Sequence, residues 1–321
     1  MVTNWLAELD GRRVTVEVPA SSANLGAGYD CLGVALGLFN RVEVEVRGWS
    51  RGEIELSVEG EGVDELAADR TNRCIQGIEA ALREVRGEMP DGVGWRIEMH
   101  NEIPLARGLG SSAAATVAGL VAGNSLLGEP LTSADLLRLA TAIEGHPDNA
   151  AAALLGGFTV SAVTDEGIEF LRFDAPRDLR AVLFIPDLRL STKDMRAALP
   201  AKVPLADAVA NIGRVAVGVA GLAMGRYDLL RVLTVDRVHE PYRAKVYPQL
   251  PGLVESARKA GAIGACLSGA GSTVVAFSDS VRTISRIEGA FSAAAADTDL
   301  PGRIAVVSPR NLGAHVVKKP G

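Results

Sequence analysis

The chain has 321 residues, 48% of them hydrophobic and 22% charged, a balance typical of a globular protein with one large or two smaller domains. The formal net charge of −6 comes without a basic cluster, which disfavours a nucleic acid partner. Three isolated cysteines, Cys31, Cys74 and Cys266, show neither metal-ligand nor disulfide spacing. The N-terminal residues lack the apolar core of a secretory signal, and no apolar run is long enough to suggest a membrane span. We therefore expect a cytoplasmic protein.

Three strands with alternating polarity are expected in the first 60 residues. Valines at every second position of 14–18 predict a strand that ends at Pro19, because proline cannot donate to a sheet ladder. Similar runs follow at 42–47 and 53–59. Strands with one polar face are typical of antiparallel sheets.

A glycine-rich stretch at 104–115 lies between an alternating strand at 95–100 and an apolar helix. This order places Ser111 and Ser112 in the first helical turn, where backbone N–H groups are free and the macrodipole is positive. Glycines in the loop would let the backbone approach a ligand closely. The stretch therefore predicts an anion site, most often a phosphate site.

By itself this loop leaves the type of nucleotide site open. It lacks the Gly-Lys pair of a P-loop, but it matches the dinucleotide pattern G-x-G-x-x-A at 108–113, with Glu129 at the expected distance. A dinucleotide-binding domain would begin with apolar parallel strands, however. The alternating N-terminal strands therefore argue against a dinucleotide-dependent oxidoreductase.

The next segment contains two helices and ends the first predicted domain. Residues 132–135 form a capping box and predict a helix that ends at Glu144, where the macrodipole disfavours a carboxylate. Asp148 is a candidate N-cap of a short helix that two glycines stop after residue 155. A strand at 158–163 then closes a domain that we place at residues 1–164.

The second predicted domain, residues 165–321, mixes strands and helices. The expected elements are a buried strand at 180–185, a loop at 187–204, an amphipathic helix at 205–222, a polar segment at 236–243, strands at 263–267 and 273–277, a helix at 281–295 and a last strand at 304–307. This mixture predicts an α+β domain of the ferredoxin-like type.

Four short motifs resemble the GHMP small-molecule kinases, and the resemblance covers nearly the whole chain. Within that superfamily the sequence is most similar to the homoserine kinase family, in VPASSANLGAGYD at 18–30, GLGSSAA at 108–114, EGHPDN at 144–149 and LSGAG at 267–271. The chain departs from the usual pattern with Tyr29 in place of Phe and Ser272 in place of Pro. The resemblance implies an N-terminal, ATP-binding domain like domain 2 of ribosomal protein S5 and a C-terminal ferredoxin-like domain.

The resemblance also implies transfer of the γ-phosphoryl group of ATP to the hydroxyl of L-homoserine, a step toward threonine. Ser112 and Glu144 would hold Mg²⁺, which takes oxygen ligands and few carboxylates. Asn72 would lie beside the adenine, although an isolated Asn in a polar turn is also typical of a helix cap. The nucleotide loop implied in this way is Pro104, Leu105, Ala106, Arg107, Gly108, Leu109, Gly110, Ser111, Ser112, Ala113 and Ala114.

An amino-acid substrate carries an ammonium and a carboxylate, so its pocket needs both an acid and a cation. Asp30 would hold the ammonium, while Arg196 and Arg243 would hold the carboxylate and the transferring group, since arginine suits bidentate contacts. The substrate-binding set that the resemblance implies is Asn24, Asp30, His146, Asn149, Arg196, Arg243 and Gly269.

Catalysis of phosphoryl transfer needs mainly positioning and charge stabilisation. Mevalonate kinase uses an Asp-Lys pair, but residues 14–40 here contain no lysine. We therefore expect direct attack by the substrate hydroxyl, oriented by Asn149 and Asp148, with Asp148 a second candidate as proton acceptor. Arg196 and Thr192 complete the expected catalytic set. A GHMP kinase for a different small alcohol is the main alternative, and the resemblance implies a homodimer.

Overall fold

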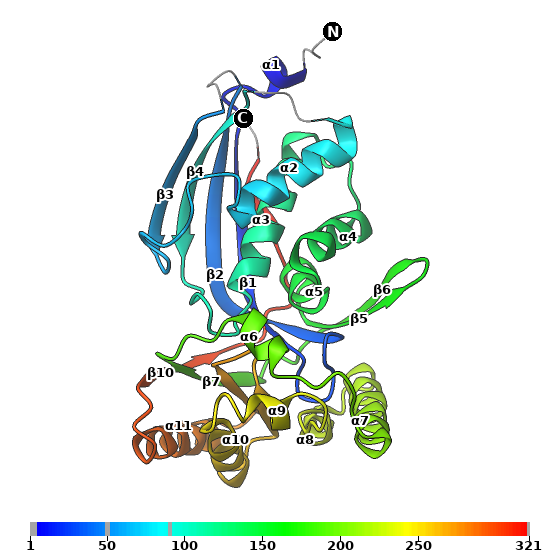
Figure 1. Ribbon diagram of the computed structural model, residues 1–321, viewed down its shortest axis with the longest axis vertical. Coiled ribbons are helices and arrows are strands. Elements are labelled where there is room, and N and C mark those ends of the chain that lie inside the picture. The colour runs from blue at the N-terminus through cyan, green and yellow to red at the C-terminus, as the bar shows by residue number, and fades with distance from the viewer. Residues whose placement is uncertain (1–4, 49–51, 89–91, 320–321) are drawn as a thin grey trace.

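The computed structural model describes residues 5–48, 52–88 and 92–319 of the chain. Its strands form two sheets that lie one above the other in Figure 1, and helices cover each sheet. The larger sheet has the order β11-β1-β2-β4-β3, and β5 joins β2 to β6. Its strands are β1 (Arg13–Ala23), β2 (Leu32–Arg47), β3 (Ile54–Gly60), β4 (Gly94–Asn101), β5 (Phe158–Thr164), β6 (Gly167–Phe173) and β11 (His315–Lys318).

Strand β1 continues past Pro19, so the predicted end at this proline was wrong. The pairing register between β1 and β2 shifts between Pro19 and Ala20, and such an irregularity accommodates a residue that cannot donate to the ladder. Because β1 continues, it delivers Ser21 and Ala23 to the junction between the two sheets.

The predicted antiparallel pairing holds for β2, which pairs with β1 and β4 in that direction. Strand β3 instead runs parallel to β4. The helix between them, α2 (Arg73–Arg86), makes a crossover connection, and such connections return the chain in the same direction. Alternating polarity reports a polar face, not the direction of the neighbouring strand.

Helices cover one face of the larger sheet (Figure 1). Two of them pack unusually closely, because Gly77 of α2 and Gly119 of α3 leave no room for a side chain. A Cβ at Gly119 would lie 1.9 Å from the carbonyl oxygen of Cys74. This contact brings the first residues of both helices to the same region. The remaining helices of this part are α1 (Trp5–Leu9), α3 (Ser111–Leu126), α4 (Ser133–Glu144) and α5 (Asp148–Leu155).

The smaller sheet has the order β10-β7-β9-β8 with antiparallel pairing throughout, which is the predicted ferredoxin-like arrangement. One face of this sheet has a core of its own, which includes Phe184, Phe291 and Leu253. The other face, with Leu183 and Phe277, packs into the core of the larger sheet. Its elements are β7 (Arg180–Pro186), β8 (Gly264–Leu267), β9 (Val274–Ser278), β10 (Gly302–Val307), α6 (Thr192–Ala197), α7 (Leu205–Ala223), the 3₁₀ helix η1 (Tyr227–Leu229), α8 (Leu230–Leu233), α9 (Glu240–Arg243), α10 (Leu250–Lys259) and α11 (Val281–Ala296).

Several elements differ from the prediction. The predicted loop at 187–204 contains α6, whose N-cap is Ser191, with its side chain accepting from the Asp194 N–H. The strand at 304–307 is not the last, because β11 follows it and pairs with β1 in the larger sheet. Strand β6 also joins the larger sheet, and both strands lie beyond residue 164. Sheet membership therefore crosses the predicted domain boundary, and the division at 164 stays a prediction.

Helix α7 forms where the amphipathic helix was predicted, but much of its apolar face is exposed. The exposed fractions of Leu205, Val209 and Ile212 are 78%, 58% and 68%, while Leu222 is buried. This helix is also long and apolar enough to cross a membrane by length and composition alone, which is weak evidence in a single helix.

Candidate active site

A cleft of about 240 Å³ lies where the N-terminus of α3 meets the loops at 24–30 and 269–270. The structure brings most of the predicted site residues to this cleft, although they come from segments far apart in the chain. The predicted residues that line it are Asn24, Asp30, Pro104, Ala106, Arg107, Gly108, Leu109, Gly110, Ser111, Ser112, Ala113, Glu144, His146, Asp148, Asn149, Thr192, Arg196, Arg243 and Gly269.

The glycine-rich loop ends at Gly110, the N-cap of α3, so Ser111 and Ser112 occupy the first turn as predicted. Gly108 and Gly110 both have positive φ angles, 73° and 71°. Their missing side chains, however, make room for protein. A Cβ at Gly110 would lie 2.1 Å from Ser21 Oγ, and one at Gly108 would lie 2.1 Å from the Ser268 carbonyl oxygen. The glycines therefore seat the loop between β1 and the loop after β8, which leaves the first turn of α3 facing the cleft.

Glu144, the last residue of α4, faces the first turn of α3. Its Oε1 accepts hydrogen bonds from Ser112 Oγ at 3.0 Å and Thr116 Oγ1 at 2.6 Å, and Arg73 Nε lies 3.7 Å away. These partners compensate a carboxylate at the unfavourable end of a helix. Within the described ranges no three His, Cys, Asp or Glu residues cluster as a metal site. One carboxylate and one hydroxyl suit Mg²⁺, which fills its remaining positions with phosphate and water.

A second cavity of about 250 Å³ adjoins the cleft and shares Arg73, Ala106, Ser111 and Ser112 with it. Asn72 lies in its wall and caps α2 at the same time, because its Oδ1 accepts from the Cys74 N–H at 2.9 Å. This asparagine can therefore cap the helix and still face a ligand in the cavity. Apolar and amide groups of the larger sheet also line this cavity, namely Asn40, Val42, Met99 and Asn101, as does Leu105 from the loop after β4. Such a lining suits a flat aromatic base.

At the opposite side of the cleft Asp30 and Arg196 form a bidentate ion pair, which the sequence did not predict. Arg196 Nη2 lies 2.7 Å from Asp30 Oδ1, and Nη1 lies 3.0 Å from Oδ2. Arg196 Nη1 also donates to the Tyr29 hydroxyl at 2.8 Å. The hydrogen bond from the Asn24 amide to the Gly269 carbonyl, 2.9 Å, ties the Asn24–Asp30 loop to the second sheet.

Arg243 is the second cation of this region, and only 1% of the residue is exposed. Its Nη1 donates to the Gly269 carbonyl oxygen at 2.8 Å and contacts His239 Nδ1 at 3.2 Å. The Tyr29 ring lies 5.4 Å from the guanidinium carbon. Arginine at such a buried position needs partners for its donors, and Nε has none among the described residues.

Asp148 occupies the first position of α5 and not the predicted N-cap, which is Pro147. Its Oδ1 lies 2.8 Å from His146 Nδ1 and accepts from the Asn149 N–H at 2.7 Å. The hydrogen bond with Asp148 raises the pKa of His146, although burial alone would lower it. The Asn149 side chain in turn accepts from Ser21 Oγ at 2.9 Å. This chain of contacts fixes polar groups at the floor of the cleft.

Four predicted residues lie outside the cleft or make contacts that the prediction did not include. Asn72 and Leu105 line the adjoining cavity, whereas Ala114 is buried in the core and lines neither. The Arg107 side chain bonds to the carbonyl groups of Pro186 and Asp187 and so links the glycine-rich loop to the smaller sheet.

Sequence reasoning also missed three residues that line the cleft, namely Ala23, Arg73 and Ala270. Ala23 and Ala270 lie inside the motifs at 18–30 and 267–271, so their place in these motifs could have identified them as site residues. Arg73 directly follows Asn72, and nothing in its own neighbourhood distinguishes it from a solvated cation.

The cleft thus combines a helix N-terminus and a carboxylate–hydroxyl pair on one side with an acid and two guanidinium groups on the other. A phosphate-bearing nucleotide suits the first side, and a small polar acceptor suits the second. Together with the two-sheet architecture, these features define a small-molecule kinase of the GHMP type. The family model for the GHMP kinases N terminal domain matches residues 72–157, and that for GHMP kinases C terminal matches residues 221–297.

Homoserine kinase of Moorella thermoacetica is 43% identical over 302 residues, which are 94% of this chain and 99% of that protein. Homoserine kinase of Caldanaerobacter subterraneus is 40% identical over 98% of both chains. A crystal structure of homoserine kinase from Cytophaga hutchinsonii superposes with a TM-score of 0.82 at 30% identity, covering 95% of this chain and 97% of that one. The chain belongs to the homoserine kinase family.

Proposed function

We propose that the enzyme transfers the γ-phosphoryl group of ATP to the side-chain hydroxyl of L-homoserine and releases ADP and O-phospho-L-homoserine, a step of threonine biosynthesis. One observation carries this proposal. The cleft places the first turn of α3 and Glu144 within the same cavity as Asp30, Arg196 and Arg243. A phosphoryl donor and a zwitterionic acceptor would each find complementary charge there.

For the nucleotide, we assign the triphosphate to the loop at 104–114, where backbone N–H groups of the first turn of α3 are free. The adenine would occupy the adjoining cavity beside Asn72. Ser112 and Glu144 would hold Mg²⁺, which when bound neutralises charge on the phosphate oxygens. Their 3.0 Å contact leaves both oxygens near one point, which suits a shared cation.

For the acceptor, Asp30 would hold the substrate ammonium, with Asn24, His146 and the Gly269 carbonyl nearby. Arg243 would hold the substrate carboxylate. Arg196 would lie between the substrate and the transferring group. Its ion pair with Asp30 means that the substrate enters a site whose charges already compensate each other. The substrate would then either bind beside the intact ion pair or separate Asp30 from Arg196 and contact each of them.

For the reaction, we propose direct in-line attack: the homoserine oxygen forms a bond to the γ-phosphorus while the bond to the β-γ bridging oxygen breaks, ADP leaves, and the hydroxyl proton passes to an oxygen of the transferred phosphoryl group. Asn149 and Asp148 would orient the hydroxyl, and Thr192 and Arg196 would contact the transferring group. Asp148 Oδ1 already accepts from His146 and from the Asn149 N–H, which favours an orienting role over that of general base. A loose transition state needs little assistance from a base.

The test is a coupled ADP-release assay with ATP and Mg²⁺ against a panel of alcohols that includes L-homoserine, mevalonate and galactose. We expect the highest kcat/KM with homoserine. A higher kcat/KM with another alcohol would refute homoserine as the preferred acceptor. The absence of turnover with every alcohol would refute kinase activity on this panel.

We further propose a homodimer in the cytoplasm, without nucleic acid or membrane partners, in which the exposed face of α7 packs against a second copy. Val209 and Ile212 lie one turn apart on this face, and a Cβ at Gly213 would meet no other atom within 4 Å. Light scattering should give a dimer for the parent and a monomer for Ile212→Glu. A monomeric parent, or flotation of the parent with vesicles, would refute this proposal.

A further inference from the structure

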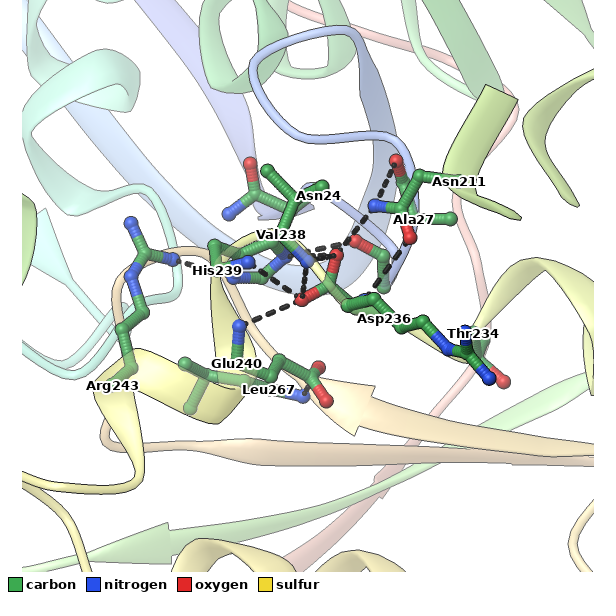
Figure 2. A network of polar contacts seen from close by, with 12 residues as sticks. Asn24, Ala27, Asn211, Thr234, Asp236, Val238, His239, Glu240, Arg243 and Leu267 are labelled. Atoms are coloured by element: carbon green, nitrogen blue, oxygen red, sulfur yellow. Dashed lines mark hydrogen bonds and ion pairs between the residues drawn. The ribbon is translucent and has the colours of Figure 1, made fainter. Parts of the chain in front are cut away.

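Two hydrogen-bond partners restrict the Arg243 guanidinium, and one of them, His239, was not among the predicted site residues. The two residues are four positions apart around α9, so their side chains lie on the same side of one helical turn. His239 is fully buried. Its Nε2 contacts the Gly26 carbonyl oxygen and also lies 3.8 Å from Asp236 Oδ1, and its Nδ1 contacts Arg243. Figure 2 shows the ring between Arg243 and the loop that carries Ala27.

The contacts of His239 define which nitrogen carries the proton. Nε2 lies 2.8 Å from the Gly26 carbonyl oxygen, and because a carbonyl only accepts, Nε2 must donate. In a neutral ring Nδ1 is then an acceptor, and it faces Nη1 of Arg243, which only donates. Burial lowers the pKa of His239 to about 4; the nearby Asp236 carboxylate opposes this shift, and the positive charge of Arg243 adds to it. The neutral form is therefore the one present near pH 7.

A further residue holds His239 in place. Asp236 Oδ2 accepts from the backbone N–H groups of His239 at 2.8 Å and Glu240 at 2.7 Å, which fixes the turn that opens α9. Asp236 Oδ1 accepts from the Asn211 amide at 2.6 Å. Figure 2 shows these bonds converging on one carboxylate. The ring of His239 has little freedom to leave Arg243.

Arg243 Nη1 is therefore occupied by two acceptors, His239 Nδ1 and the Gly269 carbonyl oxygen. The other terminal nitrogen, Nη2, points away from His239 in Figure 2 and has no hydrogen-bond partner among the described residues. Nε also has no partner among the described residues, but it is buried. Since Arg243 lines the cleft, Nη2 is the terminal donor that remains for a ligand.

We propose that His239 is a positioning residue, which occupies Nη1 of Arg243 and so turns Nη2 of the same guanidinium toward the carboxylate of the amino-acid substrate. Its second bond, to Gly26, connects this arginine to the Asn24–Asp30 loop, which carries the predicted ammonium partner. One imidazole thus keeps the two ends of the substrate pocket in register. The inference rests on the proposed function, because it assumes that Arg243 binds this carboxylate.

Two substitutions separate the two bonds of His239. In His239→Gln the amide nitrogen can still donate to Gly26, but no acceptor remains at the place of Nδ1. In His239→Asn the amide oxygen takes the place of Nδ1 and can accept from Arg243. We expect His239→Gln to raise the KM for homoserine about tenfold, the lower end for a lost bond to a charged group, because the bond to Gly269 remains. His239→Asn should stay within about threefold of the parent, and neither should change the KM for ATP.

Asn124→Ala is the matched control, because Asn124 is also buried and bonded to backbone, at the far end of α3. It should lower the thermal midpoint without changing the KM for homoserine. In an Arg243→Met background, His239→Gln should cause no further loss of kcat/KM. An unchanged KM in His239→Gln, equal rises for both substrates, or additive losses with Arg243→Met would overturn the inference. A parent inactive with homoserine would instead overturn the proposed function, and this inference with it.

Discussion

Replacing Asp30 with asparagine tests the charge recognition of the proposed acceptor pocket. Asp30 has a φ of 56°, a left-handed conformation that asparagine tolerates better than most residues. Its backbone N–H donates to Asn24 Oδ1 at 3.0 Å, and this bond does not depend on the carboxylate. The loop should therefore keep its shape in Asp30→Asn, and only the negative charge facing Arg196 is lost.

The expected loss follows from the exposure of the ion pair. Removing one partner of a desolvated charge pair costs about 2–5 kcal/mol. The exposed fractions of the Arg196 and Asp30 side chains are 36% and 32%, so water screens part of the interaction and the lower end applies. About 2 kcal/mol corresponds to a roughly 30-fold rise in the KM for homoserine. The KM for ATP should not change, because the nucleotide side lies across the cleft.

The assay compares homoserine with 4-hydroxybutanoate, which lacks the ammonium, in parent and variant. The parent should use 4-hydroxybutanoate poorly, and Asp30→Asn should lose little more with it, since the partner of the charge is already absent. Equal losses with both substrates would mean that Asp30 only supports the loop. Higher activity of the parent with mevalonate than with homoserine would refute the proposal that the pocket recognises both charges of an amino acid.

Three further changes probe other parts of the cleft. Glu144→Gln can still accept from Ser112 but loses the charge, so kcat should fall at least tenfold with an altered Mg²⁺ dependence; normal turnover at saturating ATP would contradict the metal assignment. Gly110→Val would put a Cβ against Ser21, so the loop must shift and the affinity for ATP, measured by calorimetry, should fall sharply. A folded variant that binds ATP as tightly as the parent would contradict this role of the loop. His146→Gln should lower the thermal midpoint when it is measured below about pH 6.5. The pKa of His146 is raised in the folded state, so the stabilisation by its pairing with Asp148 is present at low pH and is lost as the pH rises through that pKa. A difference in midpoint that does not depend on pH would contradict the pairing.

Local chemistry allowed the nucleotide side of the site to be predicted from sequence. The helix that begins at Ser111, the capping box at Thr132 and the end of α4 at Glu144 depend on residues within a few positions of each other. What the sequence could not show is why Gly110 is a glycine. The atom that excludes a side chain there belongs to Ser21, which lies on another strand.

Long-range contacts account for most of what was missed. The pairing of Asp30 with Arg196 joins residues 166 positions apart, and each alone resembles a solvated charge or a substrate ligand. Hydrophobic periodicity correctly located α7, but it reports an apolar face without reporting what covers that face, so the exposure of Ile212 was not expected. The parallel direction of β3 depends on the helix between the paired strands, which alternation does not include.

The pairing of β11 with β1 also has a consequence for how the chain is made. In this pairing Val16 lies opposite Val316, about 300 residues later. A ribosome releases β1 before the other strands of this sheet, but the outer edge of that strand stays unpaired until β11 has been synthesised. Open strand edges invite pairing with other chains, and contacts so distant in sequence form slowly. The first strand of the sheet to leave the ribosome is therefore among the last to be covered.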